Sequence, residues 1–272
     1  MSRRWKTTWI FACRTAIFLG CAISPTLAQT PPDEWQFRAY LYGYWATLTG
    51  SATFPTGTSA NLTVDPNQLL HSLNFAIMGT FEAQRGPWGV FTDLMYLDAS
   101  GSKSATRALS IGGVAVPSGV TANASLDLKS TVWTLAGTDH ILTTPEATFD
   151  VLLGTRYLDL RQHLTWNFSA DVSPFVGPNR QGSADSNFDN WDAIIGVKGR
   201  LMFGDQHAWF VPYYADVGTG GSQLTWQAIA GVGYTFHWGE VLGAWRYLDY
   251  HFSKESARLS MNGPAIGIAF RW

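Results

Sequence analysis

Apolar residues alternate with polar or small residues along about ten segments of this chain. In the first segment Trp35, Phe37 and Leu41 fall on one face, and Arg38 and Tyr42 fall on the other. A period of two residues is typical of a β-strand whose two faces meet different surroundings. The pattern predicts strands over 35–49, 74–84, 88–99, 124–137, 148–161, 190–203, 208–217, 223–236, 241–252 and 262–272.

The connections between these segments alternate in length. Short links are expected at 85–87, 204–207 and 237–240, an intermediate one at 138–147, and long polar ones at 50–73, 100–123, 162–189 and 253–261. An even number of strands with short turns at one end and long loops at the other is typical of a transmembrane barrel. In lipid a sheet must close on itself, because every backbone N–H and C=O group needs a partner within the protein. We therefore predict an all-β fold, a closed antiparallel transmembrane β-barrel of about ten strands, with eight strands as the alternative.

The placement of aromatic residues bears on a competing interpretation, a water-soluble β-sandwich with its apolar face turned inward. Trp35, Trp88, Trp191 and Trp272 lie near segment ends on the apolar face, where the interfacial girdles of a membrane barrel need them. A soluble core would instead carry large rings at mid-strand. The tripeptide Tyr-Leu-Asp also recurs at 96–98, 157–159 and 247–249, which fits a girdle ring followed by a carboxylate in water.

The N-terminus is typical of an exported protein. Arg3 and Lys6 precede an apolar stretch at 16–23, and small residues around Ala28 offer a cleavage site. The stretch is shorter than the roughly 20 apolar residues of a membrane-spanning helix, which disfavours a retained anchor. Residues 1–28 are therefore predicted to be a signal peptide, although Cys21 also permits a lipoprotein signal.

The barrel domain is expected to comprise residues 29–272. Removing the signal peptide takes away four of the 18 basic residues and none of the 20 acidic ones, which leaves a formal net charge of −6. This charge argues against nucleic acid as a partner. Cys13 and Cys21 leave with the signal, so the mature chain carries neither a disulfide nor a thiol site.

The C-terminal segment 264–272 alternates apolar residues with others and ends on an aromatic residue. In this ending the chain resembles the small outer-membrane β-barrel proteins of Gram-negative bacteria. The resemblance implies residence in the cell outer membrane, with Phe270 and Trp272 as the signal that the barrel-assembly machinery recognises. It also implies a monomer whose partners are outer-membrane lipid and lipopolysaccharide.

The predicted inward face carries seven positive and six negative side chains, which is close to neutral. The interior of a ten-stranded barrel is only slightly wider than its side chains can fill, so these charges are expected to pair and to plug the lumen. A narrow channel for ions or small solutes is the alternative. The predicted interior charges are Arg38, Glu82, Asp93, Asp127, Lys129, Asp150, Arg156, Asp192, Lys198, Arg200, Asp216, Arg246 and Arg271.

Two groups of residues raise the question of hydrolysis. Asp139 and His140 resemble the paired acid and base of omptin-type outer-membrane proteases, but we expect them in a periplasmic turn. Asp249, His251 and Ser253 share one strand face and resemble the His/Ser pairing of outer-membrane lipid A deacylases, yet that face is the lipid side. We therefore predict a non-catalytic surface or structural protein without cofactor or metal, and a hydrolase of lipid A or peptide as a further alternative.

Overall fold

The fold was analysed in a computed structural model of the chain. It describes residues 34–53, 59–105, 110–111, 114–115, 120–172, 175–176, 180–252 and 258–272. The predicted signal peptide 1–28, with Cys13 and Cys21, lies outside the described residues, and so does Ser253.

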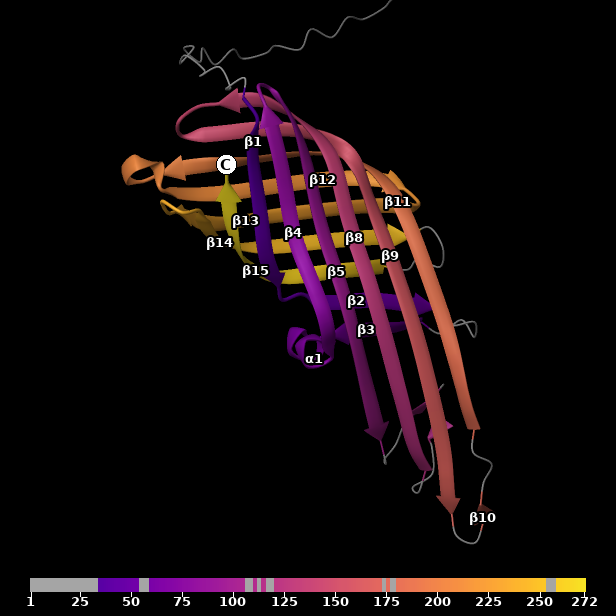
Figure 1. Ribbon diagram of the computed structural model, residues 1–272. Coiled ribbons are helices and arrows are strands. Elements are labelled where there is room, and N and C mark those ends of the chain that lie inside the picture. Colours follow the sequence, from indigo (N-terminus) through magenta and orange to yellow (C-terminus); the bar gives the residue numbers. More distant parts are fainter. Residues whose placement is uncertain are drawn as a thin grey trace, which may run out of the picture.

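Within the described residues, ten antiparallel strands form a barrel that closes where the first strand pairs with the last (Figure 1). This closing pair, which we call the seam, runs in register from Arg38 opposite Arg271 to Tyr44 opposite Ala265. The predicted ten-stranded antiparallel barrel is confirmed. The ten strands are β1 (Gln36–Tyr44), β4 (Leu73–Arg85), β5 (Trp88–Ala105), β8 (Val120–Thr143), β9 (Ala147–Val172), β11 (Arg180–Phe203), β12 (Trp209–Gly220), β13 (Ser222–Thr235), β14 (Glu240–Phe252) and β15 (Arg258–Arg271).

Shorter elements accompany the barrel. A hairpin of two strands continues the sheet beyond β15, so the predicted first strand 35–49 is split and the expected loop 50–73 contains regular structure. No helix among the described residues is long and apolar enough to cross a membrane. The shorter elements are β2 (Thr47–Thr53), β3 (Ser59–Val64), α1 (Pro66–His71), β6 (Ser110–Ile111), β7 (Val114–Ala115), β10 (Phe175–Val176) and the 3-10 turn η1 (Asp205–His207).

Four neighbouring strands, β5, β8, β9 and β11, are much longer than a membrane requires (Figure 1). β9 has 26 residues, about 85 Å of strand, whereas a spanning strand needs about ten. The predicted long loops 100–123 and 162–189 are therefore wrong in large part, since strand pairing continues into both. Both faces of such an extension meet water, so it needs no apolar alternation and carries no such signal in the sequence.

The two ends of the barrel consequently differ. At the short-turn end the strands are joined by links at 86–87, 144–146, 204–208 and 236–239. At the opposite, projecting end, the four long strands extend beyond the rest of the wall. The predicted 138–147 link shrinks to three residues, so Asp139 and His140 lie in β8 and not in a turn.

The outer face carries an apolar belt bounded by two rings of aromatic side chains. Trp88 and Tyr96 mark the two rings on β5 and are eight residues apart, about 26 Å along the strand, which matches the apolar band of a membrane barrel. The exposed belt includes Leu41, Val90, Leu94, Leu135, Leu153, Ile195, Val217, Val232, Ile266 and Ile268. The ring at the short-turn end includes Trp35, Phe37, Phe81, Trp88, Trp209, Tyr234, Phe236, Trp238, Phe270 and Trp272, and the other includes Trp45, Phe75, Tyr96, Trp133, Tyr157, Trp191, Trp226 and Tyr247.

The last residue of the chain fastens the seam. The backbone N–H of Phe37 donates to the carbonyl oxygen of Trp272 at 2.8 Å, and the N–H of Trp272 donates back at 3.1 Å. The indole of Trp272 also stacks on Phe37, with ring centroids 5.9 Å apart, and tilts against Phe81 at 6.5 Å. Phe270 contacts Trp238 at 6.0 Å on the same outer face.

Replacing Trp272 by Ala should weaken the barrel, because each lost aromatic contact is worth about 0.5–1.5 kcal/mol. Gel mobility after incubation at increasing temperatures measures this, since a closed barrel and an unfolded chain migrate differently. Trp88→Ala is the matched control, because Trp88 is equally exposed in the same aromatic ring but lies away from the seam. Equal losses of thermal stability in the two variants would contradict the role assigned to Trp272.

Candidate functional site

The lumen contains a buried arginine at mid-height. Arg246 donates to Asp93 at 2.7 Å, to the hydroxyl of Tyr42 at 2.7 Å and to the side-chain oxygen of Gln227 at 2.7 Å. Tyr42 and Thr80 each donate a further hydrogen bond of 2.7 Å to Asp93. Five residues from β1, β4, β5, β13 and β14 therefore converge on one ion pair across the barrel.

A second buried arginine lies on the opposite wall. Arg156 has no exposed surface and forms an ion pair with Asp216, which also accepts a hydrogen bond from Tyr214. The remaining guanidinium N–H groups donate to Thr134 at 3.2 Å and to Thr225 at 3.3 Å. The alternating pattern of β9, β8, β12 and β13 points all five side chains inward.

Apolar side chains fill the lumen on the projecting side of these arginines. Leu158 lies two residues beyond Arg156 on β9, and Leu248 lies two residues beyond Arg246 on β14. Both leucines are completely buried. The cluster comprises Tyr44, Ala46, Met95, Val132, Leu158, Leu248, Tyr250 and Met261.

The sequence contained a signal for this apolar cluster. Leu158 and Leu248 are the middle residues of two Tyr-Leu-Asp repeats. Neighbouring residues on a strand point to opposite faces. Because Tyr157 belongs to an aromatic ring on the outer face, Leu158 must point into the lumen. The prediction for this repeat rested on its Tyr and Asp alone and did not include the leucine.

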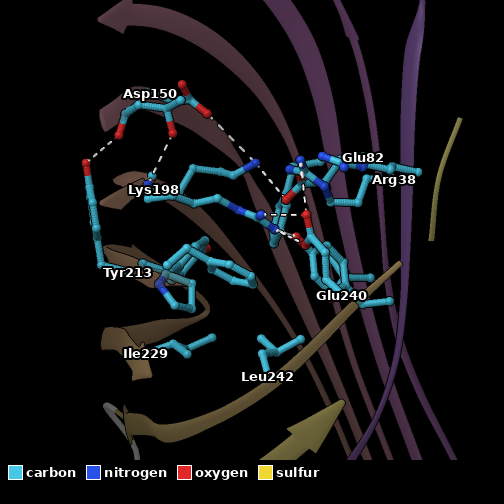
Figure 2. A pocket seen from close by; sticks show the side chains of 18 of the residues that line it. Arg38, Glu82, Asp150, Lys198, Tyr213, Ile229, Glu240 and Leu242 are labelled. Carbon is cyan, nitrogen blue, oxygen red and sulfur yellow. Dashed lines mark hydrogen bonds and ion pairs between the residues drawn. The ribbon is translucent and has the colours of Figure 1, made fainter. Parts of the chain in front are cut away.

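A cavity of about 900 Å³ occupies the lumen toward the short-turn end (Figure 2). In Figure 2 Lys198 lies between two carboxylates, 2.7 Å from Glu82 and 3.9 Å from Asp150. Arg200 makes a bidentate contact with Glu240, with bonds of 2.9 and 2.8 Å. The wall of the cavity thus carries ionised groups, whereas the lumen beyond the buried arginines is apolar.

Eleven of the thirteen side chains predicted to point inward lie in the lumen. Asp192, for example, is buried and accepts hydrogen bonds from Asn190 at 2.6 Å and from the backbone N–H of Ser222 at 2.9 Å. The eleven are Arg38, Glu82, Asp93, Asp150, Arg156, Asp192, Lys198, Arg200, Asp216, Arg246 and Arg271.

Asp127 and Lys129 are the two exceptions, because the structure places both on the outer face of β8. Lys129 is exposed and pairs with Asp98 of β5 at 3.2 Å, whereas Val132 and Thr134 of the same strand are buried inside. The prediction assumed that charge marks the lumen. In the extension of β8 the outer face meets water, so charged residues lie outside and the rule no longer holds.

Two lumen groups were missed by the sequence analysis. Glu240, which pairs with Arg200, was assigned to a turn although it shares the even-numbered face of Arg246. His140, which was expected in a periplasmic turn, lies on the inward face of β8 and contacts Asp150 inside the barrel. Side chains two residues apart on a strand share a face. Counting in steps of two from a residue known to point inward therefore identifies both groups as lumen residues.

The residues considered for hydrolysis do not form a common site in the lumen. Asp139 and His140 are adjacent on β8, so their side chains point to opposite faces and do not act as a pair. Asp249 is buried on the outer face, where it accepts hydrogen bonds from Arg258 at 3.0 Å and Tyr247 at 3.0 Å. His251 approaches the same carboxylate at 3.3 Å.

A further His/Asp pair lies on the extension. His163 of β9 faces Asp185 of β11 across the sheet, and Asp127 of β8 is its other register partner. A hydrogen bond and the negative charge of Asp185 raise the pKa of His163, because they favour the protonated ring. Both side chains are substantially exposed, so the pair is a solvated surface contact.

Comparison with known proteins places the fold. No protein-family model matches the chain, and no curated protein matches its sequence. The outer-membrane protease OmpT from Escherichia coli has a similar structure, with a TM-score of 0.50 and 9% identity over 90% of this chain and 99% of that chain. Ail, the attachment invasion locus protein of Yersinia pestis, is 10% identical over 88% and 98% of the two chains with a TM-score of 0.33.

The toluene transporter TodX of Pseudomonas putida is 13% identical over 90% of this chain and 92% of that chain, with a TM-score of 0.31. These structural neighbours are Gram-negative outer-membrane β-barrels, as the C-terminal resemblance implied. At 9% identity the likeness to OmpT concerns the fold alone.

Replacing Arg156 by Ala should destabilise the barrel strongly, because it leaves Asp216 charged, buried and without its cation. Breaking such a buried pair typically costs about 3–5 kcal/mol in the free energy of unfolding. Urea unfolding of the refolded protein in lipid vesicles measures the change. Arg161→Ala is the matched control, since the Arg161–Asp159 contact is exposed and should contribute little. Similar losses in both variants would show that the Arg156 pair is not structural.

Proposed function

We propose that this protein is an outer-membrane β-barrel with a non-catalytic surface or structural role, whose lumen is sealed. The observation that carries the proposal is the filling of the lumen, in which two buried, fully bonded arginines are followed by a packed apolar cluster. The projecting sheet is then the part of the molecule that meets the cell's surroundings.

The sealing follows from energetics as well as from packing. A conducting pore offers ions a path with polar groups that are free to replace water. Here the polar groups of Arg246 and Arg156 are engaged by Asp93 and Asp216, so an ion would have to break a buried pair. It would then have to cross the apolar cluster, where no charged group accompanies it.

The outer face of the barrel indicates what surrounds the protein. Two aromatic rings with an apolar belt between them fit a bilayer, and outer-membrane lipid is the expected solvent. Lys129 and Arg161 are register partners on β8 and β9 and lie just beyond the aromatic ring that is nearer the projecting end. Their positive charges suit the phosphates of lipopolysaccharide. We propose a monomer, inserted by the barrel-assembly machinery through Phe270 and Trp272, because the seam pairs both edges of the barrel sheet.

A narrow channel is the second candidate, and the cavity at the short-turn end favours it, since it already provides space in part of the lumen. A hydrolase is supported less well. The His163–Asp185 and His251–Asp249 pairs both lie on the outer face, and Asp249 is already engaged by Arg258.

Planar-bilayer recordings test the sealed lumen. The wild-type protein should show at most small, intermittent ion conductance, and Leu158→Gly combined with Leu248→Gly should increase it by thinning the apolar cluster. Leu153→Gly on the lipid-facing side of β9 is the control, because it removes a leucine without touching the lumen. Large, stable conductance of the wild type would favour the channel. Cleavage of lipid A or a peptide that His251→Ala or His140→Ala abolishes would favour the hydrolase.

The proposed orientation places the projecting end outside the cell and the short turns in the periplasm. Ser183→Cys on β11 should react with a membrane-impermeant thiol reagent on whole cells, whereas Asp205→Cys in η1 should react only after lysis. Both positions are exposed, so only the side of the membrane distinguishes them. The reverse labelling pattern would invert the barrel.

A further inference from the structure

The mouth of the cavity brings two cations together across the seam. Arg38 of β1 and Arg271 of β15 are direct register partners across the seam, and both line the cavity. Directly opposed side chains on neighbouring strands lie about 5 Å apart at their Cβ atoms, and like charges in such a pair repel. A site that keeps this arrangement is electrostatically prepared for an anion between the two guanidinium groups.

The carboxylates near the mouth are already engaged by other cations. Glu82 is 2.7 Å from Lys198, and Glu240 receives two bonds from Arg200, whereas Arg38 approaches these carboxylates only at 3.6 and 3.8 Å. The Nε atom of Arg38 is buried and has no hydrogen-bond partner among the described residues.

Arg271 completes the cation surplus. Within the described part of the chain, Arg271 makes no ion pair, and its side chain lies at the exposed rim of the cavity. The cavity as a whole is lined by five cationic and four anionic side chains among the described residues, so these side chains carry one positive charge in excess. A surplus positive charge at the mouth of a cavity favours a bound anion.

Apolar side chains also line the cavity. Phe91, Phe210, Ile229 and Leu242 line it, and its volume of about 900 Å³ falls in the range of small-molecule binding sites. Asp93 and Arg246 also line the cavity, so its inner end borders this buried ion pair. A pair of cations at the mouth and apolar side chains on the wall fit an organic molecule that carries one acidic group.

We propose that the cavity binds a small organic anion, whose carboxylate or phosphate group contacts Arg38 and Arg271 and whose apolar body lies against Ile229 and Leu242. Guanidinium groups donate in a fork that matches the oxygens of both acidic groups. The bound ligand enters at the short-turn end. This site is independent of a conducting lumen, because its inner end borders the closed part of the barrel.

Fluorine NMR of the protein in phosphatidylcholine nanodiscs tests the proposal with para-trifluoromethylbenzoate as the probe. The benzoate should show saturable binding beyond that of empty nanodiscs. Para-trifluoromethylbenzyl alcohol, which keeps the apolar body and lacks the charge, should bind at least about tenfold more weakly. Inorganic phosphate should displace the benzoate only at much higher concentration. Equal binding of alcohol and benzoate, or of phosphate and benzoate, would overturn the proposal.

Variants locate the site. Arg271→Gln should weaken benzoate binding about tenfold, and Arg271→Glu should abolish it while leaving the unfolding temperature unchanged or higher, because the new carboxylate faces Arg38. Arg161→Gln on the outer face is the matched control and should bind as the wild type does. Wild-type affinity in Arg271→Glu, confirmed as folded by its gel mobility, would overturn the assignment of the site to the seam.

Discussion

Backbone pairing between β1 and β15 is the interaction on which the rest of the molecule depends. An open sheet in lipid would leave two rows of N–H and C=O groups without partners, at a cost of several kcal/mol for each group. The seam removes both rows, and the carbonyl of the final residue takes part in it. Between the two aromatic rings, each strand then has lipid on one face and a narrow lumen on the other.

The narrow lumen in turn determines how its charges are arranged. Where the walls leave no room for water, Arg156 and Arg246 are stable only with a full set of partners, and both have one. Toward the short-turn end, where a cavity remains, pairing is looser and shared. The same seam that closes the barrel also brings Arg38 beside Arg271, so closure and the cation surplus have a common origin.

The alternation of apolar and polar residues was sufficient to predict the barrel, its ten strands and eleven of the inward charges. It failed where the surroundings of a strand change along its length. The outer face of β8 meets lipid near the short-turn end and water in the extension. Asp127 and Lys129 therefore lie on the outer face of the barrel, although they follow the charge pattern of the lumen. The long extensions were missed for the same reason, since strands with water on both faces need no apolar residues.

The four long strands also determine how the molecule presents itself at its projecting end. From Tyr157 in the aromatic ring, β9 continues for another 15 residues to Val172, about 50 Å of strand, paired along most of that length with β8 and β11. Chain held in a hydrogen-bonded sheet has already lost its conformational freedom. A molecule that touches this arm therefore meets an ordered surface and does not have to offset the entropy of fixing a flexible loop.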